Sequence, residues 1–349
     1  MKSVKTMKTI VTAGAMVAAV AQAEAQNNVK DYATDPAIES HTRTFLKQLN
    51  TGGGKPIETL SPVEARKVLE GAQQSVQVND GGIDVQEKTI TQDGVSAKIY
   101  IIRPAGKSGI LPVFMFFHGG GWVLGDFPTH KRLVHDLVVY SGLASVFVEY
   151  DRSPEARYPT ALHQCYAATK WVSLHGKEIG VDGSRLAIAG NSVGGNLVAA
   201  TALMAKDKNG PAIRFQLLFW PVTNDDFNTG SYHAYAEDRF LTRNMMIWFW
   251  DSYAPDRERR MEYYASPLKA SLDELKGLPP AMIQVAENDV LRDEGESYAR
   301  KMDEAGVNIT LFRIQGMIHD YGLLNPLATV PAVQAAMRAG ATELANALK

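Results

Sequence analysis

The stretch that most constrains the fold is residues 185–200, where an apolar run ends in a serine flanked by glycines. The four residues before Gly190 are apolar and typical of a buried strand, and small residues compatible with a helix follow Gly194. Between the two glycines lies Ser192. A serine in a sharp strand-to-helix turn needs such glycines, because side chains beside it would clash. Ser192 is therefore a candidate nucleophile, although the same pattern also occurs in ordinary turns.

The first 23 residues predict a secretory signal peptide. Three lysines at positions 2, 5 and 8 precede an apolar run over residues 10–21, and alanines at 21 and 23 form a small-x-small cleavage pattern. The apolar run is shorter than the roughly 20 residues that span a bilayer. We therefore expect export to the periplasm or the medium after cleavage near Ala23, and no stable membrane anchor. The alternative is a frayed or amphipathic N-terminus.

Composition excludes several classes of function. The chain has 349 residues, of which 45% are hydrophobic, so it can bury a large core. Its formal net charge is −2 and no basic block occurs, which argues against nucleic acid as a main partner. Cys165 is the only cysteine, so it forms no internal disulfide, and its neighbours indicate a buried thiol without a chemical role.

Strand-like and helix-like segments alternate from residue 111 onward, which predicts an α/β protein with a mostly parallel sheet and helices on both faces. An antiparallel hairpin that turns at residues 92–94 precedes this alternation. We expect two helices within 24–80 and an aromatic insertion at about 221–266 to form a helical cap over a catalytic domain at 81–349. The expected helices are 36–49, 61–74, 130–141, 159–175, 242–253, 293–305 and 331–348, and the main strands are 111–117, 144–150, 213–220, 281–286 and 309–314.

A nucleophilic serine needs a base that takes its proton and an acid that orients the base. In sheet hydrolases these partners follow the serine in the order acid, then histidine. After Ser192 the only histidines are His233, in the expected cap, and His319, just past an expected strand. Glu287 and Asp289 follow the preceding strand, and Asp289 is favoured because it lies beyond the strand end. For His319 alone, a buried structural histidine is the alternative.

Residues 118–122 read His-Gly-Gly-Gly-Trp and follow the expected buried strand 111–117. Consecutive glycines let backbone N–H groups approach a substrate, as donors to an oxyanion must. A flexible linker is the alternative, but a linker rarely follows a buried strand. The glycines match neither a dinucleotide-binding motif nor a P-loop, and no zinc-binding spacing occurs, so we predict no cofactor and no metal.

The motifs at 118–122, 190–196, 289–295 and 316–319 together resemble the hormone-sensitive-lipase-like family of α/β-hydrolases. The resemblance runs from about residue 111 to residue 324. It implies an α/β-hydrolase fold, with a mostly parallel sheet of about eight strands and a helical cap. It also implies that Ser192, Asp289 and His319 form a catalytic triad.

The resemblance further implies an oxyanion hole made by the backbone amides of Gly120, Gly121 and Val193. Trp122 and Asn191 are expected to contact the substrate. The family usually has aspartate and alanine where this chain has Asn191 and Val193. Neither departure removes a residue of the triad. Because both positions flank Ser192, we expect them to affect the range of substrates.

The leading hypothesis is a serine carboxylesterase that hydrolyses short- to medium-chain esters of small molecules through an acyl-enzyme. An amidase, a deacetylase or an acyltransferase with the same triad is the alternative. A non-catalytic small-molecule receptor is a further alternative, against which His319 argues, because the receptors that resemble this family lack the catalytic histidine.

Overall fold

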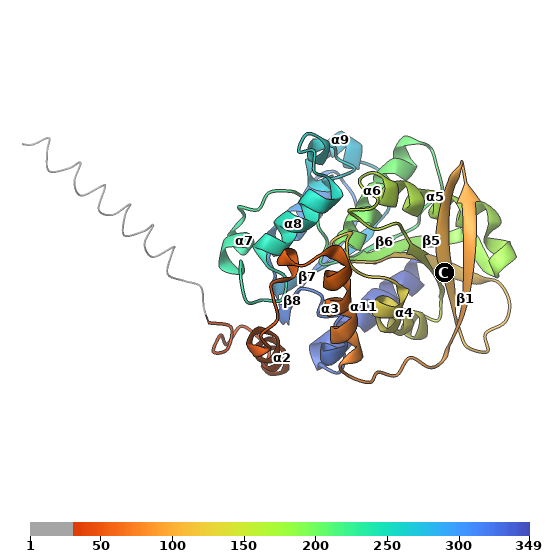
Figure 1. The fold of residues 1–349 in the computed structure, drawn as a ribbon. Coiled ribbons are helices and arrows are strands. Elements are labelled where there is room, and N and C mark those ends of the chain that lie inside the picture. The colour runs from red at the N-terminus through yellow and green to blue at the C-terminus, as the bar shows by residue number, and fades with distance from the viewer. Residues whose placement is uncertain (1–30) are drawn as a thin grey trace, which may run out of the picture.

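A computed structural model of the chain describes residues 31–349, so the predicted signal peptide at 1–23 lies outside the described residues. Eight strands form one sheet in the order β1-β2-β4-β3-β5-β6-β7-β8 (Figure 1). The pairs β1–β2 and β2–β4 are antiparallel, and all other neighbours are parallel. This confirms the α/β-hydrolase fold with a mostly parallel sheet. The strands are β1 (Ile83–Gln92), β2 (Val95–Pro104), β3 (Leu111–Phe117), β4 (Ala144–Glu149), β5 (Val181–Asn191), β6 (Gln216–Phe219), β7 (Ala281–Asn288) and β8 (Ile309–Ile318).

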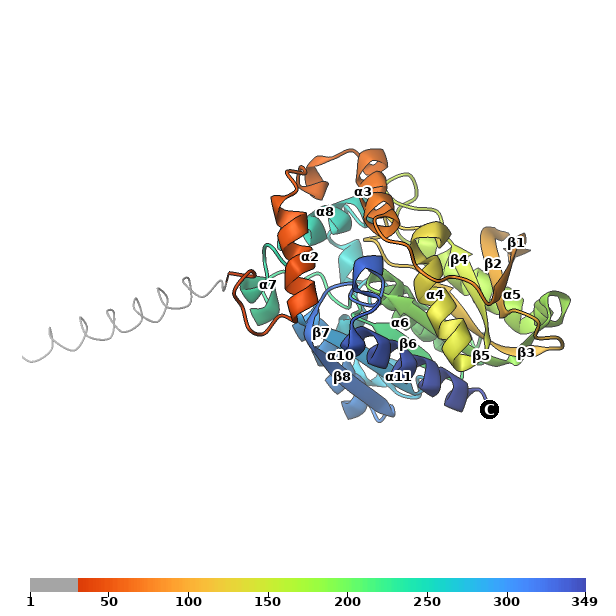
Figure 2. The same cartoon turned by 90° about the horizontal axis from the view of Figure 1, so that it is seen from below.

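Helices cover both faces of this sheet (Figures 1 and 2). One face is covered by α4 (Phe127–Ser141) and α11 (Pro331–Ala347). The other face is covered by α5 (Thr160–His175), α6 (Val193–Asp207) and α10 (Arg292–Glu304). The sheet is therefore the middle one of three layers.

Strand β3 shows how one sequence fills both faces. The side chains of Val113, Met115 and Phe117 belong to the core under α5 and α6, whereas Phe114 and Phe116 belong to the core under α4 and α11. All five side chains are fully buried. Because successive residues of a strand point to opposite faces, an unbroken apolar run fits a strand that is covered on both sides.

Four of the remaining helices come from the two regions expected to form a cap, and Figure 2 shows α2, α3 and α8 at the same end of the molecule. Ser61 begins α3 with a capping box, in which its hydroxyl accepts from the amide of Glu64 while the Glu64 carboxylate accepts from the amide of Ser61. Thr242 caps α8 by accepting from the amide of Met245. Within residues 31–349 no helix has the length and apolar content needed to cross a bilayer. The four helices of the two expected cap regions are α2 (Ser40–Thr51), α3 (Pro62–Gln74), α7 (Gly230–Ala234) and α8 (Arg243–Tyr253). The short helix α9 (Leu272–Leu275) follows the second region, and short 3-10 turns lie at Ile57–Thr59, Gly176–Ile179, Arg259–Met261, Pro267–Lys269 and Asn325–Leu327.

Some predicted boundaries were wrong, for local reasons. The first helix begins at Ser40 and not at residue 36, because Ile38 pairs with Gly316 as a short β-bridge and the Glu39 side chain caps the helix. Strand β8 continues four residues further than expected, to Ile318. The strand expected at 213–220 is shorter at both ends, and Trp220 leaves it with a φ of +36°.

The turn between β5 and α6 depends on very close backbone contacts. A Cβ atom on Gly194 would lie 2.0 Å from the carbonyl oxygen of Phe117, and one on Gly190 would lie 2.4 Å from the carbonyl oxygen of Gly194. Real Cβ atoms do not approach backbone so closely, so only glycine lets the helix start directly against the sheet. This packing sets the position of Ser192 relative to the end of β3.

A pair of glycine-to-alanine variants tests this packing constraint. Gly194→Ala should lower the free energy of unfolding by about 3 kcal/mol or more, because the new methyl group forces backbone apart in a filled core. Gly71→Ala is the matched control, since Gly71 is exposed within α3 and, among residues 31–349, no atom beyond its own stretch of helix lies within 4 Å of the added Cβ. It should raise stability by up to about 1 kcal/mol. Urea unfolding measures both changes, and equal stabilities of the two variants would contradict the account.

Candidate active site

Ser192 lies at the tip of the β5–α6 turn, in a backbone conformation that non-glycine residues seldom adopt. Its φ and ψ are 56° and −122°. Its amide donates to the carbonyl oxygen of Phe219 at 2.9 Å, and its own carbonyl accepts from the amide of Val222 at 3.1 Å. These bonds to the chain around the end of β6 hold the strained residue in place. The hydroxyl is thereby presented at the carboxyl end of the sheet, as in a nucleophile elbow.

The structure brings Ser192, His319 and Asp289 into one hydrogen-bonded chain. The distance from Ser192 Oγ to His319 Nε2 is 2.9 Å, and the distance from His319 Nδ1 to Asp289 Oδ2 is 2.7 Å. Asp289 follows β7 and His319 follows β8, so both residues lie at the carboxyl end of the sheet, as Ser192 does. The second oxygen of Asp289 accepts from the amide of Leu291 at 3.0 Å, which fixes the orientation of the carboxylate.

This geometry determines which atoms donate. A carboxylate can only accept, so Nδ1 of His319 carries the proton and donates it to Asp289. Nε2 is then left as the acceptor of the Ser192 hydroxyl proton. The pair of bonds therefore prepares His319 to act as a general base toward Ser192.

Burial and nearby charges shift the pKa of His319 in opposite directions. Burial lowers the pKa of its imidazole, whereas the negative charges of Asp289 and Asp320 and the hydrogen bond to Asp289 raise it. The net effect is a pKa above the usual 6.5. Two other buried histidines differ from His319 in the direction of the shift. Burial lowers the pKa of His130 to about 4 and that of His118 well below its usual range.

The neighbouring acidic residues have other partners. Glu287 accepts from the amide of Gly316 at 2.8 Å. Glu294 is fully buried, accepts from the amide of Thr223 at 2.7 Å, and burial raises its pKa well above the usual value. Asp289 is thus the acid that the structure places at His319.

The loop after β3 passes beside Ser192 and presents two amides. Gly120 and Gly121 have positive φ values of 100° and 64°, and within residues 31–349 neither amide has a hydrogen-bond acceptor. A Cβ on Gly121 would lie 2.1 Å from the Phe249 ring, so the loop can approach α8 this closely only with glycine. Val193 is the first residue of α6, where a helix leaves its N–H group without an internal partner.

Trp122 and Asn191, which were expected to contact substrate, do not line the cavity above Ser192. The ring of Trp122 is fully buried and stacks on Tyr253, with ring centroids 4.0 Å apart. The Asn191 side chain accepts from the amide of Gly119 at 3.0 Å and donates to Asp320 at 3.1 Å. Both residues therefore support the loops that form the site.

Asp320 is the residue that the sequence-based prediction missed. Its side chain lines the cavity beside Ser192, and its Oδ2 lies 3.9 Å from His319 Nε2. The only sequence signal was its place directly after His319. It also explains the asparagine at position 191, because a carboxylate there would face the carboxylate of Asp320 in a buried site.

The cavity above Ser192 is small, about 70 Å³, and mainly apolar. Its floor includes Ser192, His319 and Asp320, and the two expected cap regions supply most of its walls. Both regions thus cover the candidate nucleophile. The apolar wall residues are Phe45, Leu49, Ile57, Val68, Leu69, Ala72, Leu124, Phe240, Leu241, Met245 and Phe249.

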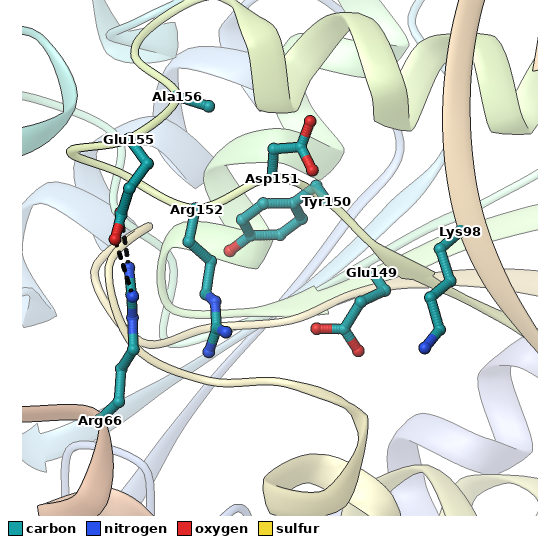
Figure 3. Close-up of a pocket in the computed structure, with 8 residues that line it drawn as sticks. All are labelled: Arg66, Lys98, Glu149, Tyr150, Asp151, Arg152, Glu155 and Ala156. Atoms are coloured by element: carbon teal, nitrogen blue, oxygen red, sulfur yellow. Dashed lines mark hydrogen bonds and ion pairs between the residues drawn. The ribbon is translucent and has the colours of Figure 1, made fainter. Parts of the chain in front are cut away.

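A second, larger cleft of about 490 Å³ lies beside the loop that follows β4 (Figure 3). Neither Ser192 nor His319 lines it. Arg66 from α3 forms two hydrogen bonds with Glu155 there, at 2.9 and 2.7 Å, and also donates to the carbonyl of Val123 at 2.8 Å. This part of the cleft therefore links α3 to the glycine-rich loop, which is the loop that follows β3 and carries the three consecutive glycines. The lining residues are Arg66, Lys98, Glu149, Tyr150, Asp151, Arg152, Glu155 and Ala156.

Comparison with known proteins agrees with this geometry. A family model described as "alpha/beta hydrolase fold", which covers the hormone-sensitive-lipase-like esterases, matches residues 114–323. The carboxylesterase NlhH of Mycobacterium tuberculosis is 35% identical over 266 residues, which are 76% of this chain and 83% of NlhH. The chain belongs to the hormone-sensitive-lipase-like esterases. It is accordingly a carboxylic ester hydrolase.

Two further proteins are similar to this esterase. An ethyl acetate hydrolase of Pseudomonas putida is 30% identical over 295 residues, covering 82% of this chain and 91% of the relative. The crystal structure of a thermostable esterase from Pseudomonas putida ECU1011 is 62% identical with a TM-score of 0.90, and the match covers 90% of this chain and 99% of that one. The likeness therefore includes the helices around the site as well as the sheet.

The raised pKa of His319 predicts the pH dependence of the esterase. Only the neutral imidazole can accept the serine proton, so kcat/KM should rise with pH and reach half its maximum above pH 6.5. Initial rates with a non-ionising p-nitrophenyl ester between pH 5 and 9 measure this. A half-maximum at or below pH 6 would contradict the assignment, provided that the enzyme stays folded over the range.

Proposed function

We propose that this esterase hydrolyses short- to medium-chain carboxylic esters through an acyl-enzyme on Ser192. The observation that carries the proposal is the continuous hydrogen-bonded chain from Asp289 through His319 to Ser192, at the floor of a small apolar cavity. Such a chain activates a hydroxyl that is otherwise a weak nucleophile.

Each residue has a defined role in the proposed reaction. Ser192 Oγ attacks the ester carbonyl carbon as His319 Nε2 takes its proton, and His319 then returns that proton to the leaving alcohol. Asp289 orients the imidazole and stabilises its charged form. The amides of Gly120 and Gly121, together with that of Val193, would stabilise the oxyanion.

The size of the cavity supports a preference for short acyl groups. A volume of about 70 Å³ leaves little room beside Ser192, and bulky side chains such as Phe45, Phe240 and Phe249 close it. One relative is named for its action on ethyl acetate, which is a short ester. An amide hydrolase or an acyltransferase would use the same triad, and no contact among residues 31–349 favours either over ester hydrolysis.

Substitution of Ser192, combined with a series of acyl lengths, tests the proposal. Ser192→Ala should reduce ester hydrolysis at least about a thousandfold, because loss of the nucleophile removes the acyl-enzyme route. In the wild type, rates with p-nitrophenyl esters from acetate to palmitate should be highest at the short to medium lengths. Near-wild-type activity of Ser192→Ala would contradict the role of the serine, and a maximum at palmitate would contradict the proposed chain length.

We also propose that the esterase is exported after cleavage near Ala23. The lysine-rich start, the apolar run and the alanines at 21 and 23 support this. Expression of the full chain in a bacterium with an export pathway, followed by intact mass measurement, should give a product that lacks residues 1–23. Ala23→Tyr should retain them, because a large residue blocks cleavage. A wild-type product with its full N-terminus would contradict the proposal.

A further inference from the structure

Asp320 places a second carboxylate at the catalytic histidine, on the side that faces the cavity. Asp289 contacts Nδ1 of His319 at 2.7 Å, whereas Oδ2 of Asp320 lies 3.9 Å from Nε2. A separation of 3.9 Å is too long for a direct hydrogen bond. It is short enough for one water oxygen to lie within hydrogen-bond distance of both atoms.

The Asp320 carboxylate is held in this position by buried partners. Its Oδ1 accepts from Nδ2 of Asn191 at 3.1 Å and from Nε1 of Trp220 at 2.8 Å. Both donors are fully buried, and Asp320 itself is only 5% exposed. Because both donors are used on Oδ1, the other oxygen remains directed toward His319 and the cavity.

The backbone at Asp320 is also held in an unusual conformation. Asp320 has a φ of +58°, in the left-handed region that few non-glycine residues adopt. The following loop is tied down by Arg132, which donates to the carbonyl oxygens of Gly322 at 2.6 Å and Leu323 at 2.9 Å. A charged residue in a strained backbone position, buried beside the nucleophile, indicates a role in the reaction.

We propose that Asp320 orients the water molecule that hydrolyses the acyl-enzyme, a role that rests on the proposed acylation of Ser192. The leaving alcohol of the first step and the attacking water of the second step occupy the same position beside Nε2 of His319, because the second step is the reverse of the first with water in place of the alcohol. They differ in one substituent. Where the alcohol oxygen carries carbon, the water carries a second proton, and Oδ2 of Asp320 accepts the hydrogen bond from that proton.

The bonds of the second step balance without another reactant. The water oxygen bonds to the ester carbonyl carbon as one water proton passes to Nε2 of His319, and the carbonyl electron pair moves to the oxyanion. The second proton stays on the water oxygen, hydrogen-bonded to Asp320. When the oxyanion collapses, the bond from carbon to Ser192 Oγ breaks, and His319 returns its proton to Oγ. The free carboxylic acid leaves.

This role gives the esterase a preference between acyl acceptors. Water can donate to His319 and Asp320 together, whereas an alcohol has one hydroxyl proton and can donate only to His319. The carboxylate therefore favours hydrolysis over transfer of the acyl group to alcohols. Substrate class is unchanged, since the same ester acylates Ser192 in both cases.

Partition of the acyl-enzyme between water and methanol tests this role. In Asp320→Asn the amide oxygen can still accept from Asn191 and Trp220, which leaves an NH2 group facing His319, so the acceptor for water is lost. The ratio of methyl ester to free acid, measured in mixtures of water and methanol, should rise about tenfold over the wild type, the effect of one hydrogen bond to a charged group. Any change in the basicity of His319 acts on both acceptors and cancels in the ratio.

Two further variants complete the experiment. Asp320→Gly removes the carboxylate and suits the positive φ, so its ratio should rise in the same way even if one variant folds poorly. Asp303→Asn is the matched control, because Asp303 is exposed on α10, and its ratio should stay at the wild-type value. The kcat/KM for ester hydrolysis, which reports acylation, should change less than the rate of deacylation in both Asp320 variants.

The outcomes separate this inference from the proposed function. If Ser192 becomes acylated and the ratio in both Asp320 variants equals that of the wild type, the role of Asp320 is wrong and the triad stands. If no acyl-enzyme forms on Ser192 during turnover, the proposed mechanism itself is wrong, and the role of Asp320 falls with it.

Discussion

The hydrogen-bonded chain from Asp289 through His319 to Ser192 is the interaction on which the site depends. Its bonds are 2.7 and 2.9 Å long, and its members come from three different loops. Such bonds tolerate displacements of the donor and acceptor atoms of only a few tenths of an ångström. The parallel strands β5, β7 and β8 meet this requirement, because their carboxyl ends lie along one edge of a single sheet.

The surrounding structure buries this hydrogen-bonded chain and fixes it in place. The helices before β1 and those after β6 supply most of the apolar walls of the cavity, and Arg66 ties α3 to the glycine-rich loop. Burial strengthens charge interactions such as the one proposed between Asp289 and the imidazolium of His319. The small, mainly apolar cavity beside Ser192 also supports the proposed preference for short acyl groups. The residues that cover the site therefore also form the walls of the cavity at Ser192.

The fold and the triad could be predicted because their signals are local. The run over β3 is apolar at every position, and Ser192, Asp289 and His319 each follow a strand in the order that the chemistry requires. Asp320 could not be assigned in this way, because its place depends on Asn191 and Trp220, which are 129 and 100 residues distant in sequence.

Side-chain direction was the other property that the sequence did not reveal. Trp122 and Asn191 lie next to residues of the predicted site, yet a positive φ turns the backbone at Trp122, and the Asn191 amide is used by two neighbouring loops. Adjacency in sequence therefore did not reveal the contacts that these two side chains make within the protein. The helix boundary near residue 36 was missed for the same reason, since the pairing of Ile38 with Gly316 is a long-range contact.

Reaction of the purified esterase with a fluorophosphonate, followed by mass mapping of the labelled peptide, tests the central claim most directly. Only a hydroxyl activated by a base reacts quickly with this electrophile. The account predicts one adduct, on Ser192, that forms at least about a hundredfold more slowly when His319 is replaced by alanine. An adduct at another residue, or equal rates for the wild type and His319→Ala, would contradict it.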